Sequence, residues 1–137
     1  MKRLPPFLFA AALAVVLLTA CDRLMSVEQR LDRAQSAFDA GHDSAAMADV
    51  KTVLEREPAN AAGRILLARL TLRLGDATTA RKELERAVQA GVDASTASEL
   101  DQSILLAQGR FADALAAAQK EAGDQSTRRQ LVIVEAL

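Results

Sequence analysis

The stretch LLARLTLRLGDATTARKEL, which spans Leu66 to Leu84, decides the fold. Its first half carries leucines at helical spacing with arginines between them, and this pattern predicts an amphipathic helix. Gly75 and Asp76 then predict a break, because glycine suits the left-handed residue that closes a helix and aspartate caps the next one. Apolar residues at helical spacing return from Ala77 to Ala90. The stretch therefore predicts two helices joined by a tight turn.

This hairpin recurs along the chain with a constant step of 34 residues. Three columns keep that step, with one polar departure at Gln102: Gly41, Gly75 and Gly109; Ala46, Ala80 and Ala114; and Ala34, Ala68, Gln102 and Ala136. A gapless period of this length in helix–turn–helix units is typical of tetratricopeptide repeats. Over about residues 27–137 the chain thus resembles the tetratricopeptide-repeat (TPR) family.

The predicted fold class is all-α, an α-α superhelix of TPR helix hairpins with about three units and a lone C-terminal helix. The expected units cover about residues 27–60, 61–94 and 95–128, with a partial unit at 129–137. We expect unit three to be the loosest, because its second helix is mostly alanine with Phe111 and Leu115 as its main anchors. Gly123 is expected to end that helix before the partial unit begins near Arg128.

The partial unit carries an apolar face, whereas terminal repeats usually have a polar outer side. Its apolar residues are Leu131, Val132, Ile133, Val134 and Leu137. Two explanations stay open. Either the chain is the opening part of a longer array, or this edge docks a partner or a second copy of the chain.

Residues 1–20 have the composition of an export signal. Lys2 and Arg3 give a positive start, and the run from Phe7 to Thr19 is apolar or nearly so. That run is short for a membrane span, which needs about 20 residues, and it fits the apolar core of a secretory signal peptide.

The tetrapeptide Leu18, Thr19, Ala20 and Cys21 resembles the lipobox of bacterial lipoproteins. That resemblance implies cleavage before Cys21, acylation of its sulfur, and a short tether over residues 21–26. Two or more acyl chains suffice for stable membrane anchoring. An ordinary signal peptide with a chance cysteine, or an uncleaved anchor, is the alternative. Asp22 resembles the inner-membrane retention signal of enterobacterial lipoproteins, so the periplasmic face of the inner membrane is slightly favoured over the outer membrane.

Composition argues against several classes of function. The chain has 17 basic and 18 acidic residues, which leaves no basic footprint for nucleic acid. His42 is the only histidine, and it falls in a predicted turn where a solvent-facing side chain is expected. The sequence has no metal-ligand spacing, phosphate-binding loop or nucleophile motif. We therefore expect no enzyme activity and no cofactor apart from the covalent lipid.

The TPR resemblance implies a protein or peptide partner bound in a groove lined by the first helix of each unit. Helical phase predicts these inward positions: Glu28, Leu31, Gln35, Phe38 and Asp39; Ile65, Arg69, Leu72 and Arg73; and Glu99, Ser103 and Leu106. Arg69 and Arg73 lie one turn apart, and a pair so placed can fork onto a carboxylate or a peptide backbone. A solvated charged stripe that only keeps the helix soluble is the alternative.

A narrower resemblance rests on the lipobox with Cys21 and Asp22, the run from Ala34 (AQSAFDAGHDSAAMADVKTVLEREPANAAGRILLARLTLRLGDATTARKELERAVQAGV), and LLAQGRF at 105–111. These pieces are similar to PrsT, the TPR-repeat lipoprotein family of exosortase/PEP-CTERM systems in Gram-negative bacteria. The resemblance implies an interaction scaffold for exopolysaccharide production or export, or for sorting of PEP-CTERM proteins. The alternative is an outer-membrane assembly or pilotin-type lipoprotein for secretins, pili or barrel proteins.

Overall fold

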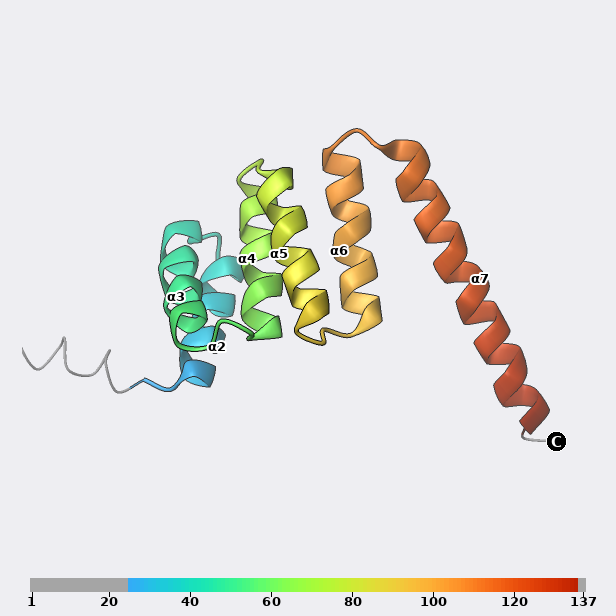
Figure 1. The fold of residues 1–137 in the computed structure, drawn as a ribbon, viewed down its shortest axis with the longest axis horizontal. Coiled ribbons are helices and arrows are strands. Elements are labelled where there is room, and N and C mark those ends of the chain that lie inside the picture. Colours follow the sequence, from blue (N-terminus) through green and yellow to red (C-terminus); the bar gives the residue numbers. More distant parts are fainter. Residues whose placement is uncertain (1–24, 136–137) are drawn as a thin grey trace, which may run out of the picture.

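A computed structural model describes the backbone of residues 25–135 and the side chains of residues 25–124. The described chain is entirely helical, which confirms the predicted all-α class (Figure 1). Its helices are α2 (Val27–Asp39), α3 (Asp43–Arg56), α4 (Ala61–Arg73), α5 (Ala77–Gln89), α6 (Ala94–Ala107) and α7 (Phe111–Glu135). The predicted signal peptide, the lipidation site at Cys21 and Asp22 lie outside the described residues.

The helices form three successive hairpins, α2–α3, α4–α5 and α6–α7, arranged in a row (Figure 1). Each hairpin after the first packs its first helix against the second helix of the hairpin before it, α4 on α3 and α6 on α5. The first helices also contact one another, α2 with α4 and α4 with α6. This is the stacked arrangement expected of a TPR superhelix, and it places α2, α4 and α6 along one face.

Each hairpin turn is closed by the glycine that the period predicts. Gly41, Gly75 and Gly109 have φ of 75°, 86° and 72°. After each glycine the next backbone N–H bonds back across the end of the helix, for example from Asp76 to the Thr71 carbonyl at 2.9 Å. A Cβ added at these glycines would meet no atom within 4 Å. The backbone conformation alone therefore requires glycine here.

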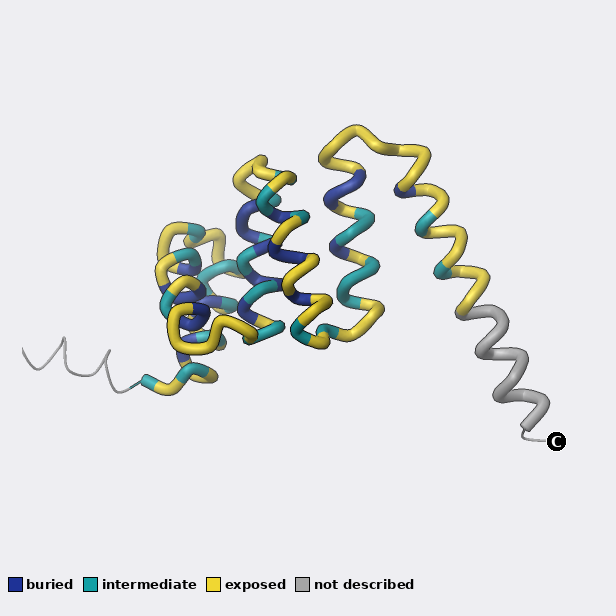
Figure 2. The backbone as a smooth tube through the Cα atoms, in the orientation of Figure 1, coloured by how far each residue is buried: buried dark blue, intermediate teal, exposed yellow. Residues whose placement is uncertain are grey.

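Small residues let the two helices of a hairpin approach closely. Ala46 on α3 and Ala80 on α5 are fully buried in the same column of the repeat, facing Ala34 and Ala68 on the first helices. Around them lie two apolar clusters, one between the first hairpin and α4 and the other between the second hairpin and α6. In Figure 2 the buried residues of α4, α5 and α6 are dark blue. The core is thus continuous across the hairpin boundaries.

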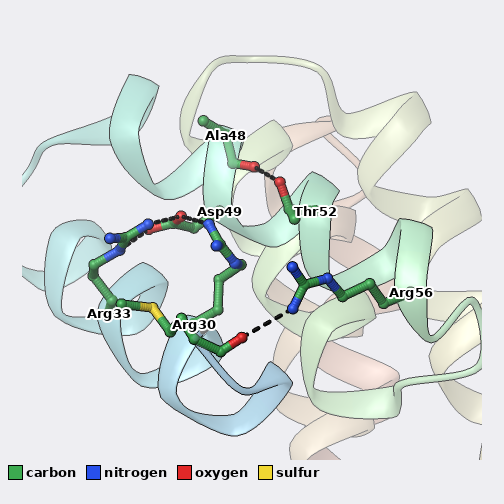
Figure 3. Close-up of polar contacts among 7 residues, drawn as sticks. Arg30, Arg33, Ala48, Asp49, Thr52 and Arg56 are labelled. Carbon is green, nitrogen blue, oxygen red and sulfur yellow. Dashed lines mark hydrogen bonds and ion pairs between the residues drawn. The ribbon is translucent and has the colours of Figure 1, made fainter. Parts of the chain in front are cut away.

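A buried ion pair joins the two helices of each of the first two hairpins. In the first, Arg30 Nη1 and Arg33 Nε lie 3.0 and 2.7 Å from the carboxylate of Asp49, so that both guanidinium groups converge on it (Figure 3). In the second, Arg64 Nη1 lies 2.7 Å from Glu83 Oε2. Arg64 and Glu83 follow Arg30 and Asp49 by one 34-residue step. The charged residues of the buried ion pairs therefore recur every 34 residues, as the turn glycines and the small residues do.

The third hairpin departs from the predicted boundaries. Gly123 does not end a helix, since α7 runs through it to Glu135, so the expected separate helix from Arg128 is wrong. Gly123 does not have the positive φ of the turn glycines, and a glycine inside a helix costs only about 1 kcal/mol relative to alanine. Leu131, Ile133 and Val134 fall in the part of α7 described by its backbone alone, and Leu137 lies outside the described residues.

The anchors expected for α7 are also wrong. Phe111 and Leu115 are 67% and 60% exposed, whereas Ala114 is buried. The two helices of this hairpin contact each other less than those of the first two, and α7 leans away from α6 along its length (Figure 1). Ala114 is the only hydrophobic side chain of α7 buried within residues 111–124, so little apolar surface holds α7 against α6, and the expectation of a loose third unit fits this geometry.

Candidate binding groove

The first helices of all three hairpins line one open hollow of about 320 Å³. Its lining comes from α2, α4 and α6 and consists of Phe38, Arg69, Leu72, Arg73, Glu99, Leu100 and Ser103. All of these except Leu100 were predicted from helical phase. Leu100 was missed because its side chain is almost fully buried and belongs to the apolar face, yet it borders the hollow between Glu99 and Ser103.

Other predicted groove positions lie elsewhere. Gln35 and Asp39 do not line the hollow and bond to each other, Nε2 to Oδ1 at 2.8 Å, on the surface of α2. Ile65 is a core residue and Leu31 packs against the first apolar cluster. Leu106 is 52% exposed and Glu28 is also exposed, at the other end of its helix from Phe38. The predicted stripe is wider than the hollow, because helical phase shows which residues share a face of one helix but not which of them a neighbouring helix covers.

Arg73 is held by contacts within the protein. Its guanidinium carbon lies 3.6 Å from the centre of the Phe38 ring, and its Nη2 donates to the Phe38 carbonyl at 3.0 Å. It also forms a salt bridge with Asp43 at the start of α3. The predicted fork of Arg69 and Arg73 on one ligand therefore does not fit, because Arg73 already has a carboxylate, a carbonyl and an aromatic face as partners.

Arg69 is the cation that the hollow offers to a ligand. It is half-buried on α4, and among residues 25–124 it forms no salt bridge or side-chain hydrogen bond. Glu99 on α6 is exposed and likewise has no salt bridge within that part of the chain. Leu72 and Leu100 supply apolar surface between these charges. Beside Arg73, which is already paired, the hollow thus offers a ligand one cation, one carboxylate and apolar surface between them.

The described residues also bear on metal binding and on membrane insertion. Residues 25–135 contain no group of three or more His, Cys, Asp and Glu side chains placed to hold a metal ion. His42 lies exposed at the start of α3, and its side chain makes no capping hydrogen bond. Over the described part of the chain, no helix has the length and apolarity needed to cross a bilayer.

Residues 37–100 match the Tetratricopeptide repeat family. The matched segment runs from the end of α2 to the first half of α6 and covers the whole of the second hairpin. Together with the stacked hairpins, the match supports a TPR protein. Comparisons with curated proteins and with solved structures returned no match. TPR domains generally bind protein or peptide partners and are typically non-enzymatic scaffolds.

Proposed function

We propose that this protein is a membrane-anchored scaffold on the periplasmic side that binds an extended peptide segment of a partner protein in the hollow between α2, α4 and α6. The observation that carries the proposal is the joining of Arg69, Leu72 and Glu99 in one concavity built from three hairpins. A single helix surface would give a charged stripe, whereas a concavity buries part of a ligand and strengthens each polar contact.

The chemistry of the lining defines the class of peptide. Arg69 is placed to pair with a carboxylate of the ligand, because a guanidinium recognises that group with two parallel hydrogen bonds. Leu72 and Leu100 receive an apolar side chain next to it. Glu99 is left to accept from a backbone N–H or a basic side chain. The favoured ligand is therefore a segment with an acidic and an apolar residue close together.

Site-directed photo-crosslinking tests this proposal in cells. A photoreactive residue replaces Ser103, which lines the hollow and is exposed, and a control chain carries it at Lys51, which is exposed on α3. A partner adduct is expected from position 103 alone, and Arg69→Glu is expected to abolish it without changing the circular dichroism spectrum. An adduct that survives Arg69→Glu, or that forms equally from position 51, would show that the hollow is not the binding site.

The membrane anchor rests on the lipobox resemblance at Leu18 to Cys21. Metabolic labelling with palmitate is expected to mark the wild-type chain and not Cys21→Ser, which should remain an uncleaved precursor. Normal labelling of that variant would contradict the anchor. Fractionation of inner and outer membranes then tests whether Asp22 retains the protein in the inner membrane, and outer-membrane enrichment would favour a role in outer-membrane assembly.

A role in exopolysaccharide export or PEP-CTERM sorting rests on the narrower resemblance to the PrsT family. Deletion of the gene is expected to reduce secreted polysaccharide or to mislocalise PEP-CTERM proteins. Complementation with the wild-type gene should restore the phenotype, and Arg69→Glu should not. Full complementation by Arg69→Glu would separate the pathway role from the hollow.

A further inference from the structure

The buried carboxylate of each of the first two hairpins is paired with two arginines. Asp49 on α3 binds Arg30 and Arg33 of α2. Glu83 on α5 binds Arg64 of α4 and Arg86 of its own helix. Asp49 and Glu83 are 6% and 4% exposed, so both ion pairs lie between the helices that they join.

The third hairpin lacks this pair. One 34-residue step beyond Arg64 and Glu83 the sequence has Ser98 and Ala117. Ser98 and Ala117 are much smaller than Arg64 and Glu83, so they leave space between the two helices of the third hairpin. In its place is a hollow of about 370 Å³ between α6 and α7, lined by Ala94, Ser95, Ser98, Ala117, Lys120, Glu121 and Asp124. It shares no residue with the groove between α2, α4 and α6.

A carboxylate nevertheless borders this hollow, one helical turn further along α7. Glu121 stands in the column of Val53 and Ala87, which are fully buried in the first two hairpins. Its Oε2 accepts from Ser98 Oγ at 3.0 Å and from Gln102 Nε2 at 2.9 Å. Both donors are neutral and both bond to the same oxygen. Within residues 25–124, Glu121 has no cationic partner, unlike Asp49 and Glu83.

We propose that the hollow between α6 and α7 binds an arginine side chain from a partner protein, with its guanidinium donating to Glu121. The guest would then make the ion pair that the first two hairpins make within the chain. Arginine fits because the space is the one that Arg64 and Glu83 fill in the hairpin before it, and because a guanidinium presents several donors in a fixed plane. Serine hydroxyls at Ser95 and Ser98 provide further acceptors.

Charge complementarity favours this guest. Glu121 and Asp124 carry two negative charges and Lys120 one positive charge, so the ionisable residues lining the hollow sum to a net charge of −1. One guanidinium neutralises that charge, whereas a phosphate or carboxylate guest would increase it. Lys120 stands in the column of Arg86, yet it forms no salt bridge with any residue from 25 to 124. Lys120 therefore does not occupy the Glu121 carboxylate.

The test titrates acetyl-arginine methylamide into the full isotope-labelled chain in detergent micelles and follows the NMR signals of Ser98, Gln102, Ala117 and Glu121. Acetyl-citrulline methylamide, which has the same shape without the charge, is the matched ligand control. Saturable shifts are expected with arginine in the millimolar range, and about tenfold weaker binding is expected with citrulline, because a charge-assisted hydrogen bond is lost.

Two variants test the site itself. Glu121→Gln keeps an acceptor for Ser98 and Gln102 and should weaken arginine binding about tenfold or more, whereas Glu55→Gln, an exposed glutamate on α3, should not change it. Ser98→Arg should fill the hollow from within and abolish the response. Equal shifts with citrulline, unchanged affinity in Glu121→Gln, or saturation of these signals by inorganic phosphate in place of arginine would each overturn the proposal.

Discussion

The guanidinium of Arg73 lies 3.6 Å from the centre of the Phe38 ring and so joins α4 to α2. The same group donates to the Phe38 carbonyl and pairs with Asp43. One side chain therefore ties the second hairpin to both helices of the first, close to the turn at Gly41. Arg73 lines the hollow between α2, α4 and α6 but is already paired, whereas Arg69, one turn earlier, is available to a ligand.

Arg73→Ala is expected to lower the free energy of unfolding by about 1–2 kcal/mol, the sum of a cation–π contact, a half-exposed salt bridge and a hydrogen bond. Arg69→Ala should change it by less than about 0.5 kcal/mol, because no contact within the described chain is lost. Urea unfolding followed by circular dichroism measures both. Equal losses in the two variants would refute the assignment of Arg73 to structure and Arg69 to binding.

The buried carboxylate at Asp49 gives a second prediction. Asp49→Ala removes the carboxylate to which Arg30, only 5% exposed, and Arg33 both donate, and the loss is expected to be about 1–3 kcal/mol. The double replacement Arg30→Met with Asp49→Leu removes both charges and should cost less than the single change, because apolar residues of similar size can replace a buried ion pair with little loss of stability. Urea unfolding of the single and double variants gives the comparison. A double variant as unstable as Asp49→Ala would contradict this account of the pair.

The repeat period explains how much of the fold was predictable. Gly41, Gly75 and Gly109 recur in phase and set the turns, and alanine columns set the close packing between paired helices. Each of these signals is local, because a turn glycine or a small residue acts wherever its own hairpin forms. The same phase placed most of the groove lining on the first helices, including Phe38 and Arg69.

The features that the sequence did not predict depend on contacts between hairpins or on backbone angles. Arg73 finds Phe38 and Asp43 in the preceding unit, which helical phase does not show. Arg30 and Arg64 share one column of the period and Asp49 and Glu83 another, but a shared column does not show that two charged side chains on different helices meet. Gly123 was misjudged because a glycine closes a helix only where its φ becomes positive, and sequence alone does not give φ.

Gly75 and Gly123 differ in backbone conformation, so the third prediction is that replacing them by alanine changes the stability of the protein in opposite directions. Gly75 has φ of +86°, so Gly75→Ala is expected to cost about 1–2 kcal/mol, and Gly75→Val more, although a Cβ would meet no atom within 4 Å. Gly123 lies inside α7 with open space around it, so Gly123→Ala should stabilise the protein by up to about 1 kcal/mol. Thermal unfolding of the two alanine variants tests this, and shifts of the same sign would contradict the difference in backbone between them.

Acid sensitivity gives the last prediction, through the caps of α5 and α6. The Ser95 hydroxyl, followed by the Thr96 N–H, lowers the pKa of Asp93, and hydrogen bonds from Thr79 lower the pKa of Asp76. Because the folded pKa lies below the unfolded value, each carboxylate stabilises the fold above about pH 4, and this stabilisation is lost as the pH falls further. Asp93→Asn keeps an acceptor at the cap but does not titrate, so its melting temperature should fall less than that of the wild type between about pH 6 and pH 3. Parallel declines in the two proteins would show that the Asp93 charge does not contribute to the stability of α6.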